Sequence, residues 1–583
     1  MQTLFGFLSK DYKYEKIVSY FNQNNSTYKT KRFHTCLGKS YGFGIEQNVR
    51  SSFSKEFSFP GNVKLILAGD IIEKNEIDRL VLYGGKEGIS DMYTFLKSEV
   101  ICLMQRLNGI YCIVLIDPVA NRLCLFSDEH GIMPIYYYFD NQILLYGTSI
   151  KCLISFPGFV KQVNESAIYE LFKIGFTLPP STLLKNVKML IPGEILEYNG
   201  TLKTYKGKKS ELHYTCVKNI DELAEEYYEC LNSSILKLTS DFKDITILLS
   251  GGIDSAAIAA ILYKKDGTKL TCLTIDLNYN DQAESLGAQK VAALFGIEHD
   301  LVNKIDDSMA EYMPEVIWYN EAPTYNGIAE YVLAKKISRH TELVLTGDGN
   351  DLIWGAFGIY PNNYLENTGI RFFDYYLKLR SCMSDRLLDN ILTNRADKSF
   401  LFEKINYLYP NSGDLYSDSI LVDQKLFGSS FAYNIVGKIR VELSAALFRF
   451  PYLDRRVETL INRLPMNYKV RQQRDELIHK YLFKFTLEKS GILPHEIIFA
   501  RKRWMQSPNA EWLRAGLKDY FEIIVFQNDS AVKRFFKEEL IKDLWTLHQL
   551  RKQDYSYFLM MVLTFELWYK EFIENDSHRF NIC

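Results

Sequence analysis

The spacing of apolar residues divides the chain into two parts. Up to about residue 205, short apolar runs recur between polar turns such as Asp117-Pro118 and Asp140-Asn141. Short apolar runs bounded by turn residues are typical of β-strands. The runs that predict strands in this part cover residues 63–67, 110–116, 123–126, 135–139 and 143–146. Two stacked sheets flanked by helices would accommodate them, so we expect an α+β domain over residues 1–205.

The pattern changes from about residue 215. A helical stretch at 221–239 is followed by alternating strand and helix patterns that continue to Gly349. Such alternation predicts a parallel sheet covered by helices. Beyond Gly358 helical patterns dominate, and the apolar run 558–565 is too short to cross a bilayer, so it indicates a core helix. The polar stretch 361–423 fits either an insertion over the active site or a variable surface.

Length and composition limit the classes of protein that fit. A chain of 583 residues is too long for one core, so we expect domains at 1–205 and 215–583. The net charge of −2 gives no reason to expect a nucleic-acid or membrane partner. The ten cysteines include no C-x-x-C pair, and the first residues lack a signal-peptide pattern. We therefore expect buried thiols and a reducing, cytoplasmic location.

The segment LLSGGIDS at residues 248–255 carries the strongest chemical signal. It joins an apolar strand pattern at 245–247 to a helical pattern at 256–262. A glycine turn that opens a helix directs several backbone N–H groups at one point, which favours an anion there. The segment lacks the Gly-Lys-Ser/Thr ending of a Walker A loop and resembles the pyrophosphate loop of ATP pyrophosphatases. The plainer alternative is a glycine turn without a ligand.

Further motifs, in the same order along the chain, resemble those of the asparagine synthetase family. They are LNGIY at 107–111, DEHGIMPIYY at 128–137, GTSIKCL at 147–153, LLKNVKMLIPG at 183–193, GDGND at 347–351, PYLD at 451–454 and LPHEIIFARK at 493–502. In the last of these, Ala500 stands where the family pattern has an arginine. The resemblance implies an N-terminal-nucleophile hydrolase-like αββα sandwich. An α/β adenine nucleotide alpha hydrolase-like (PP-loop) synthetase domain with a helical C-terminal part would follow.

The resemblance also assigns residues to ATP and Mg²⁺, the cofactors it implies. Asp254 and Asp351 would be the two carboxylates on the metal, and Asp351 could instead cap a helix. The strand around Ile275 would lie against adenine. The residues that we expect to bind the nucleotide are Leu249, Ser250, Gly251, Gly252, Asp254, Ser255, Ile275 and Gly347.

Three further residues are expected in catalysis from the resemblance. Lys502 would meet the α-phosphate and the departing pyrophosphate, although Arg501-Lys502-Arg503 also fits a solvated basic turn. Asp348 would help to deprotonate the attacking amine. Glu321 would contact the substrate or lie at a helix end on the surface. Arg449, ahead of PYLD, is expected to be a structural ion-pair partner.

The first domain departs from the family at its reactive residue. The family's glutaminase uses a cysteine directly after the initiator methionine, and Gln2 stands there. Thr3 comes one residue late, and Cys36 cannot expose an α-amine. The family's RGPD segment is not recognisable at 32–44, and its NGEIYN loop is reduced to AGDI at 68–71. We expect a first domain that has kept its fold and lost the amidase; decay in a nonfunctional copy is the alternative.

Loss of the ammonia source is shared by the β-lactam, carbapenam and lasso-peptide macrolactam synthetases of this family. We therefore expect an AMP-forming amide ligase that closes an amide within a peptide or small-molecule carboxylate. A precursor peptide and its leader peptidase would be its partners. An asparagine synthetase that uses free ammonia is the alternative within the same class, and a non-catalytic ATP-binding scaffold is the alternative from another class.

Overall fold

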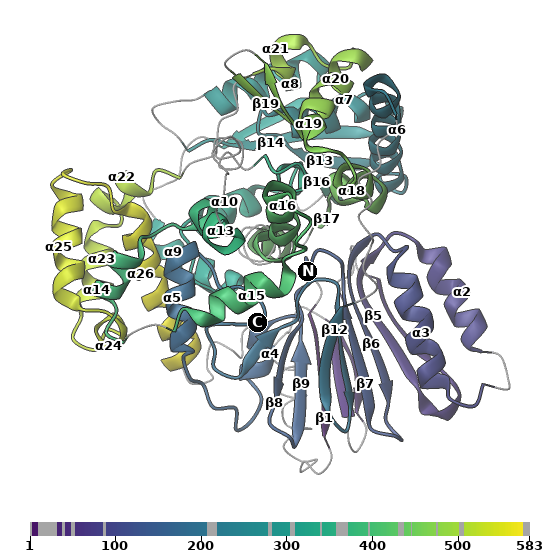
Figure 1. Cartoon of the computed structure of the whole chain (residues 1–583), viewed down its shortest axis with the longest axis horizontal. Helices are drawn as coiled ribbons and strands as arrows, with labels where there is room; N and C mark the ends of the chain where they lie inside the picture. Colours follow the sequence, from purple (N-terminus) through teal and green to yellow (C-terminus); the bar gives the residue numbers. More distant parts are fainter. Residues whose placement is uncertain are drawn as a thin grey trace.

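A computed structural model describes most of the chain (Figure 1). The described residues are 3–9, 32–37, 41–47, 53–85, 89–206, 218–277, 283–302, 309–337, 341–356, 371–394, 397–428, 437–444, 446–473, 476–500 and 507–574. The chain forms two sheets at one end, a third sheet at the other, and a helical part beside them.

The first domain contains two antiparallel six-stranded sheets. The first has the order β10-β8-β9-β1-β3-β2, with strands Val187–Met189, Tyr136–Phe139, Ile143–Gly147, Leu4–Ser9, Tyr41–Gln47 and Arg32–Leu37. The second has the order β12-β11-β7-β6-β5-β4, with strands Leu202–Lys206, Glu194–Asn199, Arg122–Ser127, Gly109–Asp117, Lys64–Ile71 and Phe53–Ser58. All five runs that predict strands are confirmed.

Alternation along these strands builds a four-layer sandwich. On β6, Cys112, Val114 and Ile116 face the other sheet, whereas Tyr111, Ile113 and Leu115 face the helices α2 (Lys74–Gly84) and α3 (Met92–Met104). Successive side chains of a strand point to opposite faces, so one strand serves both layers. Helices α4 (Ile150–Ile154) and α5 (Glu165–Ile174) contribute to the core on the far side of the first sheet. The predicted αββα arrangement is confirmed.

The third sheet is parallel and has the order β15-β14-β13-β16-β17. Its strands are Glu298–Val302, Lys269–Ile275, Asp244–Leu248, Leu343–Leu345 and Leu447–Arg449. The chain moves outward from β13 through β14 to β15, then returns to place β16 on the other side of β13. Ligands of open α/β sheets bind where the strand order reverses, so this topology directs attention to the carboxyl ends of β13 and β16.

Helices cover this sheet and fill the rest of the molecule. Those between the strands are α6 (Ile220–Leu238), α7 (Ile253–Leu262), α8 (Ala283–Phe295), α9 (Met309–Asn320), α10 (Gly327–Lys336) and α11 (Asn350–Ile353). Those after α11 are α13 (Phe372–Arg380), α14 (Asp385–Ile391), α15 (Ser399–Leu408), α16 (Leu415–Lys425), α17 (Lys438–Ser444), α18 (Arg455–Asn462), α19 (Met466–Lys469), α20 (Tyr481–Ser490), α21 (His495–Ile498), α22 (Asn509–Arg514), α23 (Lys518–Phe526), α24 (Val532–Phe535), α25 (Glu538–Gln549) and α26 (Ser556–Tyr569).

The structure adds detail to two sequence expectations in this part. The described residues of the stretch 361–423 form the helices α13 to α16, packed into the molecule, and residues 361–370 lie outside the described part. Helical patterns do dominate after Gly358, but β17 joins the parallel sheet and β18 (Val470–Gln473) pairs with β19 (Glu476–His479).

The C-terminal apolar run is confirmed as a core helix. Residues 558–569 of α26 are all buried. Among the described residues, every helix is too short or too polar to span a lipid bilayer. Of the cysteines with described side chains, Cys112, Cys124, Cys152 and Cys272 are buried as expected, whereas Cys102 and Cys382 are exposed.

Candidate active site

The glycine segment after β13 forms the predicted strand-turn-helix unit. Leu249 is buried and its N–H donates to the Leu273 carbonyl of β14 at 2.9 Å, which continues the sheet to the start of the turn. Gly251 has a φ of 73°, a conformation that other residues rarely adopt. The Ser255 hydroxyl accepts from the Ser250 N–H at 3.2 Å and ties the two ends of the turn together. The turn is thereby held open toward solvent at the N-terminus of α7.

Gly347 brings the loop after β16 against this turn. A Cβ at this position would lie 3.0 Å from Asp254 Cβ and 3.3 Å from the Ser255 nitrogen, closer than ordinary packing. Gly349, with a φ of 90°, then leads into α11. Both loops therefore meet at the carboxyl ends of adjacent strands, as the strand order indicates.

A buried lysine joins the two carboxylates at this point. Lys480 Nζ lies 2.7 and 2.6 Å from the two carboxylate oxygens of Asp254 and 2.6 Å from Asp351 Oδ1. The Asn350 side chain donates to Asp254 Oδ1 at 2.5 Å, and Tyr452 donates to the Asp254 backbone carbonyl at 2.7 Å. Burial alone would lower the pKa of Lys480, but the attraction of Asp254 and Asp351 outweighs it and raises that pKa. The lysine is held as a cation.

This arrangement fits the Mg²⁺ that the sequence predicts. Asp254 and Asp351 both pair with the Lys480 ammonium, so their carboxylates lie close enough together to serve one cation, and they are the residues that would hold the metal. The described residues contain no group of three or more His, Cys, Asp and Glu side chains that could hold a metal. Magnesium needs no such cage, because it is commonly held by one or two carboxylates together with substrate phosphates and water. The expectation that Asp351 caps a helix is not met, since the N-cap of α11 is Gly349.

Asp348 lies in the same loop and contacts a different cation. Its Oδ2 accepts from Arg440 Nη2 of α17 at 2.6 Å, and its side chain is 35% exposed, the most open of the loop's carboxylates. Arg440 Nε also lies 3.0 Å from Glu330 Oε2 of α10. Asp348 therefore has a partly exposed carboxylate in the same loop as Asp351, one of the two predicted metal ligands.

Glu321 lies elsewhere, at the junction between the two domains. Its carboxylate accepts from the Ser149 hydroxyl and from the Ile150 N–H at 2.8 Å, and Lys438 Nζ is 2.6 Å away. The side chain is 1% exposed and its φ is 58°. The contacts with Ser149 and Ile150 join the first domain to the second, and Lys438 pairs with Glu321 within the second domain. A role for Glu321 at the substrate thus stays a prediction that its contacts do not favour.

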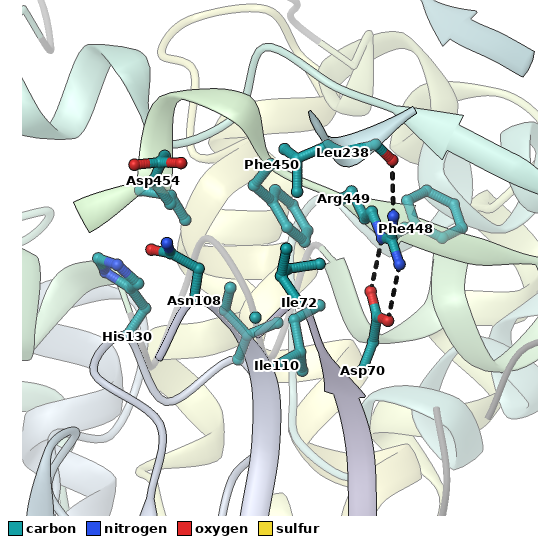
Figure 2. Close-up of a pocket in the computed structure, with 13 residues that line it drawn as sticks. Asp70, Ile72, Asn108, Ile110, His130, Leu238, Phe448, Arg449, Phe450 and Asp454 are labelled. Carbon is teal, nitrogen blue, oxygen red and sulfur yellow. Dashed lines mark hydrogen bonds and ion pairs between the residues drawn. The ribbon is translucent and has the colours of Figure 1, made fainter. Parts of the chain in front are cut away.

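A second junction contact lies beside a small cavity (Figure 2). Arg449 donates to both carboxylate oxygens of Asp70, at 2.7 and 2.9 Å, and to the Leu238 carbonyl at 2.6 Å. The predicted structural role of Arg449 is confirmed. The cavity measures about 40 Å³, and His130 and Asp454 line it together with the pair. None of the PP-loop residues is among its lining.

The structure brings together most of the site that the sequence predicts. Leu249, Ser250, Gly251, Gly252, Asp254, Ser255, Gly347, Asp348 and Asp351 lie at the carboxyl ends of β13 and β16, and buried Ile275 ends the neighbouring β14. Lys502 lies outside the described residues, so its expected role stays a prediction. Sequence reasoning missed Lys480, Arg440 and Glu330, because no local motif marks them.

Comparison with known proteins agrees with this geometry. The Asparagine synthase family matches residues 226–416 and 444–570, more than half of the chain, and the Glutamine amidotransferase domain matches residues 94–208. Glutamine-hydrolyzing asparagine synthetase 1 of Bacillus subtilis (strain 168) is 23% identical over 523 residues, which cover 80% of this chain and 78% of that protein. Amidase chry2 of Gibberella zeae is 23% identical over 327 residues, 52% of this chain and 48% of its own length.

Likeness to solved structures is weaker. An allosteric regulatory enzyme of purine biosynthesis aligns with a TM-score of 0.25 and 10% identity over 52% of this chain and 80% of its own, too distant to support an argument. The family match over most of the second domain, with the PP-loop and its carboxylates in place, carries the assignment. The chain belongs to the asparagine synthase family and is an ATP-dependent, asparagine synthetase-like carbon–nitrogen ligase.

Proposed function

We propose that the enzyme adenylates a carboxylate at the PP-loop and joins the acyl group to an amine that glutamine does not supply. The observation that carries the first part is the convergence of Asp254, Asp351 and Lys480 at the end of β13. Two carboxylates and a buried cation at the N-terminus of a helix provide opposite charges for a metal and for phosphates.

The reaction has two steps, formation of an acyl-adenylate and its attack by the amine. A carboxylate oxygen of the substrate attacks the α-phosphorus of ATP, and pyrophosphate leaves. The amine nitrogen then attacks the acyl carbon, AMP leaves with the shared oxygen, and the amine proton passes to a base. Asp348, with one oxygen held by Arg440, is the base that we assign. Magnesium, when bound, neutralises charge on the leaving pyrophosphate.

The chain's own residues would bind and orient the nucleotide. The backbone of Ser250, Gly251 and Gly252 would bind the phosphates at the start of α7. Asp254 and Asp351 would hold the magnesium ion, and Lys480, which pairs with both, would supply positive charge for the phosphates. Lys502 remains the predicted contact of the α-phosphate.

The first domain supports an amine source other than glutamine. Residue 2, two positions ahead of β1, is a glutamine. Burial raises the pKa of the Cys112 and Cys124 thiols, so neither is an activated nucleophile. Asp70, in the place of the family's NGEIYN loop, is bound on both oxygens by Arg449. An amine carried by the substrate itself would replace ammonia, which gives a macrolactam on a peptide or natural-product precursor.

The second candidate is asparagine-type synthesis from aspartate and free ammonia. The observation that favours it is the acid at position 348, where asparagine synthetases also carry an acid and β-lactam synthetases carry a tyrosine. A non-catalytic scaffold is the third candidate, and the retained Asp254, Asp351 and Lys480 argue against it.

Exchange of labelled pyrophosphate into ATP tests the proposal. Purified protein would be tested with aspartate, a panel of amino acids and small carboxylic acids, and any precursor peptide encoded beside the gene, each with and without glutamine. We expect carboxylate-dependent exchange that glutamine does not change and that Asp254→Asn and Asp351→Asn abolish. Exchange that persists in both variants would contradict the assigned site. Glutamine hydrolysis by the wild type would contradict the proposed amine source.

A further inference from the structure

Arg440 lies between two carboxylates from different elements. It is buried on α17, donates a hydrogen bond to Asp348 of the β16 loop at 2.6 Å, and forms an ion pair with Glu330 of α10 at 3.0 Å. Among the described residues these are its side-chain ion-pair partners. One guanidinium thus links the open carboxylate of the active-site loop to a carboxylate that is 4% exposed.

Helix α17 is connected to the first domain through Glu321. Lys438, two residues before Arg440, has no exposed surface, and its Nζ lies 2.6 Å from Glu321. Glu321 in turn accepts from Ser149 and from the Ile150 N–H of the first domain, and Lys151 Nζ is 3.4 Å from it. The position of Arg440 is therefore set on one side by Glu330 and on the other by a chain of contacts that begins at α4.

We propose that Arg440 is a positioning residue that fixes the Asp348 carboxylate for proton removal from the amine. The proposal rests on the function proposed above. Arg440 occupies one carboxylate oxygen, so the other is the one left to face the amine. An aspartate on a glycine-flanked loop would otherwise rotate, and small misplacements of a reacting group reduce rates steeply. Glu330 and Lys438 keep the guanidinium from following Asp348 into solvent.

The competing explanation is that Arg440 only contributes to folding. A stability effect would reduce both half-reactions together, since both need the folded site. A positioning effect would spare adenylation, which needs Asp254, Asp351 and Lys480, and would reduce the amide-forming step that needs Asp348. The ratio of the two rates therefore separates the explanations.

The experiment uses the full chain with Mg-ATP, L-aspartate and ammonium chloride as probes, together with crystal structures of the wild type and Arg440→Met. In Arg440→Met we expect the Asp348 carboxylate to leave its wild-type position while Asp254 and Asp351 remain. We expect amide formation to fall roughly ten- to a hundredfold relative to pyrophosphate exchange. Arg440→Lys should restore part of this loss. The double variant Asp348→Asn/Arg440→Met should form the amide no more slowly, relative to pyrophosphate exchange, than Asp348→Asn alone.

Arg380→Met is the matched control, because Arg380 is similarly buried and pairs with Asp423 instead of with an acid of the loop. It should lower stability and leave the ratio of the two rates unchanged. An Asp348 carboxylate that keeps its place in Arg440→Met, or losses that multiply in the double variant, would overturn the proposal. If the wild type does not turn over aspartate, that counts against the asparagine-type candidate, and the two crystal structures still decide the role of Arg440.

Discussion

Lys480 holds together two carboxylates that would otherwise repel each other. It follows β19, begins α20 with a φ of 53°, and has a side chain that is 5% exposed. It lies 226 residues from Asp254 along the chain, so only the fold brings the two into contact. Before nucleotide binds, this lysine gives the two acids a partner.

Replacement of Lys480 by methionine should make stability depend on magnesium. Two acids left without their buried cation should lower the free energy of unfolding by about 3 kcal/mol. Magnesium chloride should restore more stability in Lys480→Met than in the wild type, because the metal then has no ammonium to displace. Thermal unfolding with and without the salt measures this. Lys404→Met, which removes a buried lysine paired with Glu170, is the control and should gain nothing from magnesium. Equal shifts in all three proteins would contradict the assigned metal position.

Glu330 should make stability depend on pH. Burial raises its pKa to about 7, against the attraction of Arg440, which lowers it, and with the repulsion of Asp348, which raises it. The folded protein therefore holds this proton when the unfolded chain has lost it. Its stabilising contribution is present below the ordinary glutamate pKa and is lost as pH rises to about 7, by at most about 3 kcal/mol.

Chemical denaturation of the wild type and Glu330→Gln from about pH 5 to about pH 8 tests this. The difference between the two free energies should fall as pH rises, since the amide does not titrate. A difference that stays constant would show that Glu330 does not change its protonation in that range.

The residues of the site divide by whether a local motif marks them. Asp254 could be predicted because it follows a strand pattern in a glycine-bearing segment, and Asp351 because the segment around it resembles a motif of the asparagine synthetase family. Lys480 and Arg440 could not, because their partners come from distant segments and the residues around them form ordinary helix starts. Glu321 could be picked out by resemblance, but its burial against the first domain depends on how the domains pack, which no local pattern contains.

At the scale of elements, the site depends on how closely the β16 loop approaches α7. Gly347 permits this approach, since a side chain there would meet Asp254 Cβ at 3.0 Å. The parallel sheet and the strand-turn-helix unit could be predicted from hydrophobic periodicity, whereas the order of the strands is known only from the structure. The short strand β17 and the β18–β19 hairpin could not, because three or four residues give too little periodicity among helices.

Gly347→Ala should move this loop and weaken nucleotide binding. The added methyl group would displace either Asp254 or the loop, so we expect affinity for Mg-ATP to fall by roughly tenfold or more while the fold survives. Isothermal titration measures the affinity. Gly85→Ala is the control, because its Cβ would meet only ordinary contacts at 3.6 and 3.7 Å. Unchanged affinity in Gly347→Ala would show that the close approach is not needed.

At the scale of the whole molecule, two buried ion-pair clusters join the domains. One is formed by Arg449 and Asp70 beside the cavity of Figure 2, and the other by Glu321 with Lys438 and Lys151. Arg449 ends β17 and Lys438 begins α17, so the two clusters fix the positions of these two elements of the second domain. The first domain, with or without an amidase, would thus serve the synthetase by holding these elements.

Arg449→Met should weaken the union of the domains. It leaves Asp70 buried without its partner, which costs about 3–5 kcal/mol when such a pair is broken. Arg456→Met removes a half-exposed partner of Asp454 and should cost less than about 1 kcal/mol. Urea denaturation followed by separate probes of each domain measures both. If Arg449→Met lowers the free energy of unfolding no more than Arg456→Met does, the Arg449–Asp70 pair does not hold the domains together.

The proposed function depends above all on one step, the conversion of a carboxylate to an acyl-adenylate at the PP-loop. Its most direct test supplies the carboxylate that supports pyrophosphate exchange with both oxygens labelled as ¹⁸O, and then analyses the released nucleotide by mass spectrometry. We expect AMP that carries one labelled oxygen, because the attacking oxygen stays with phosphorus when the amine displaces AMP. ADP with labelled phosphate, or AMP without label, would contradict it.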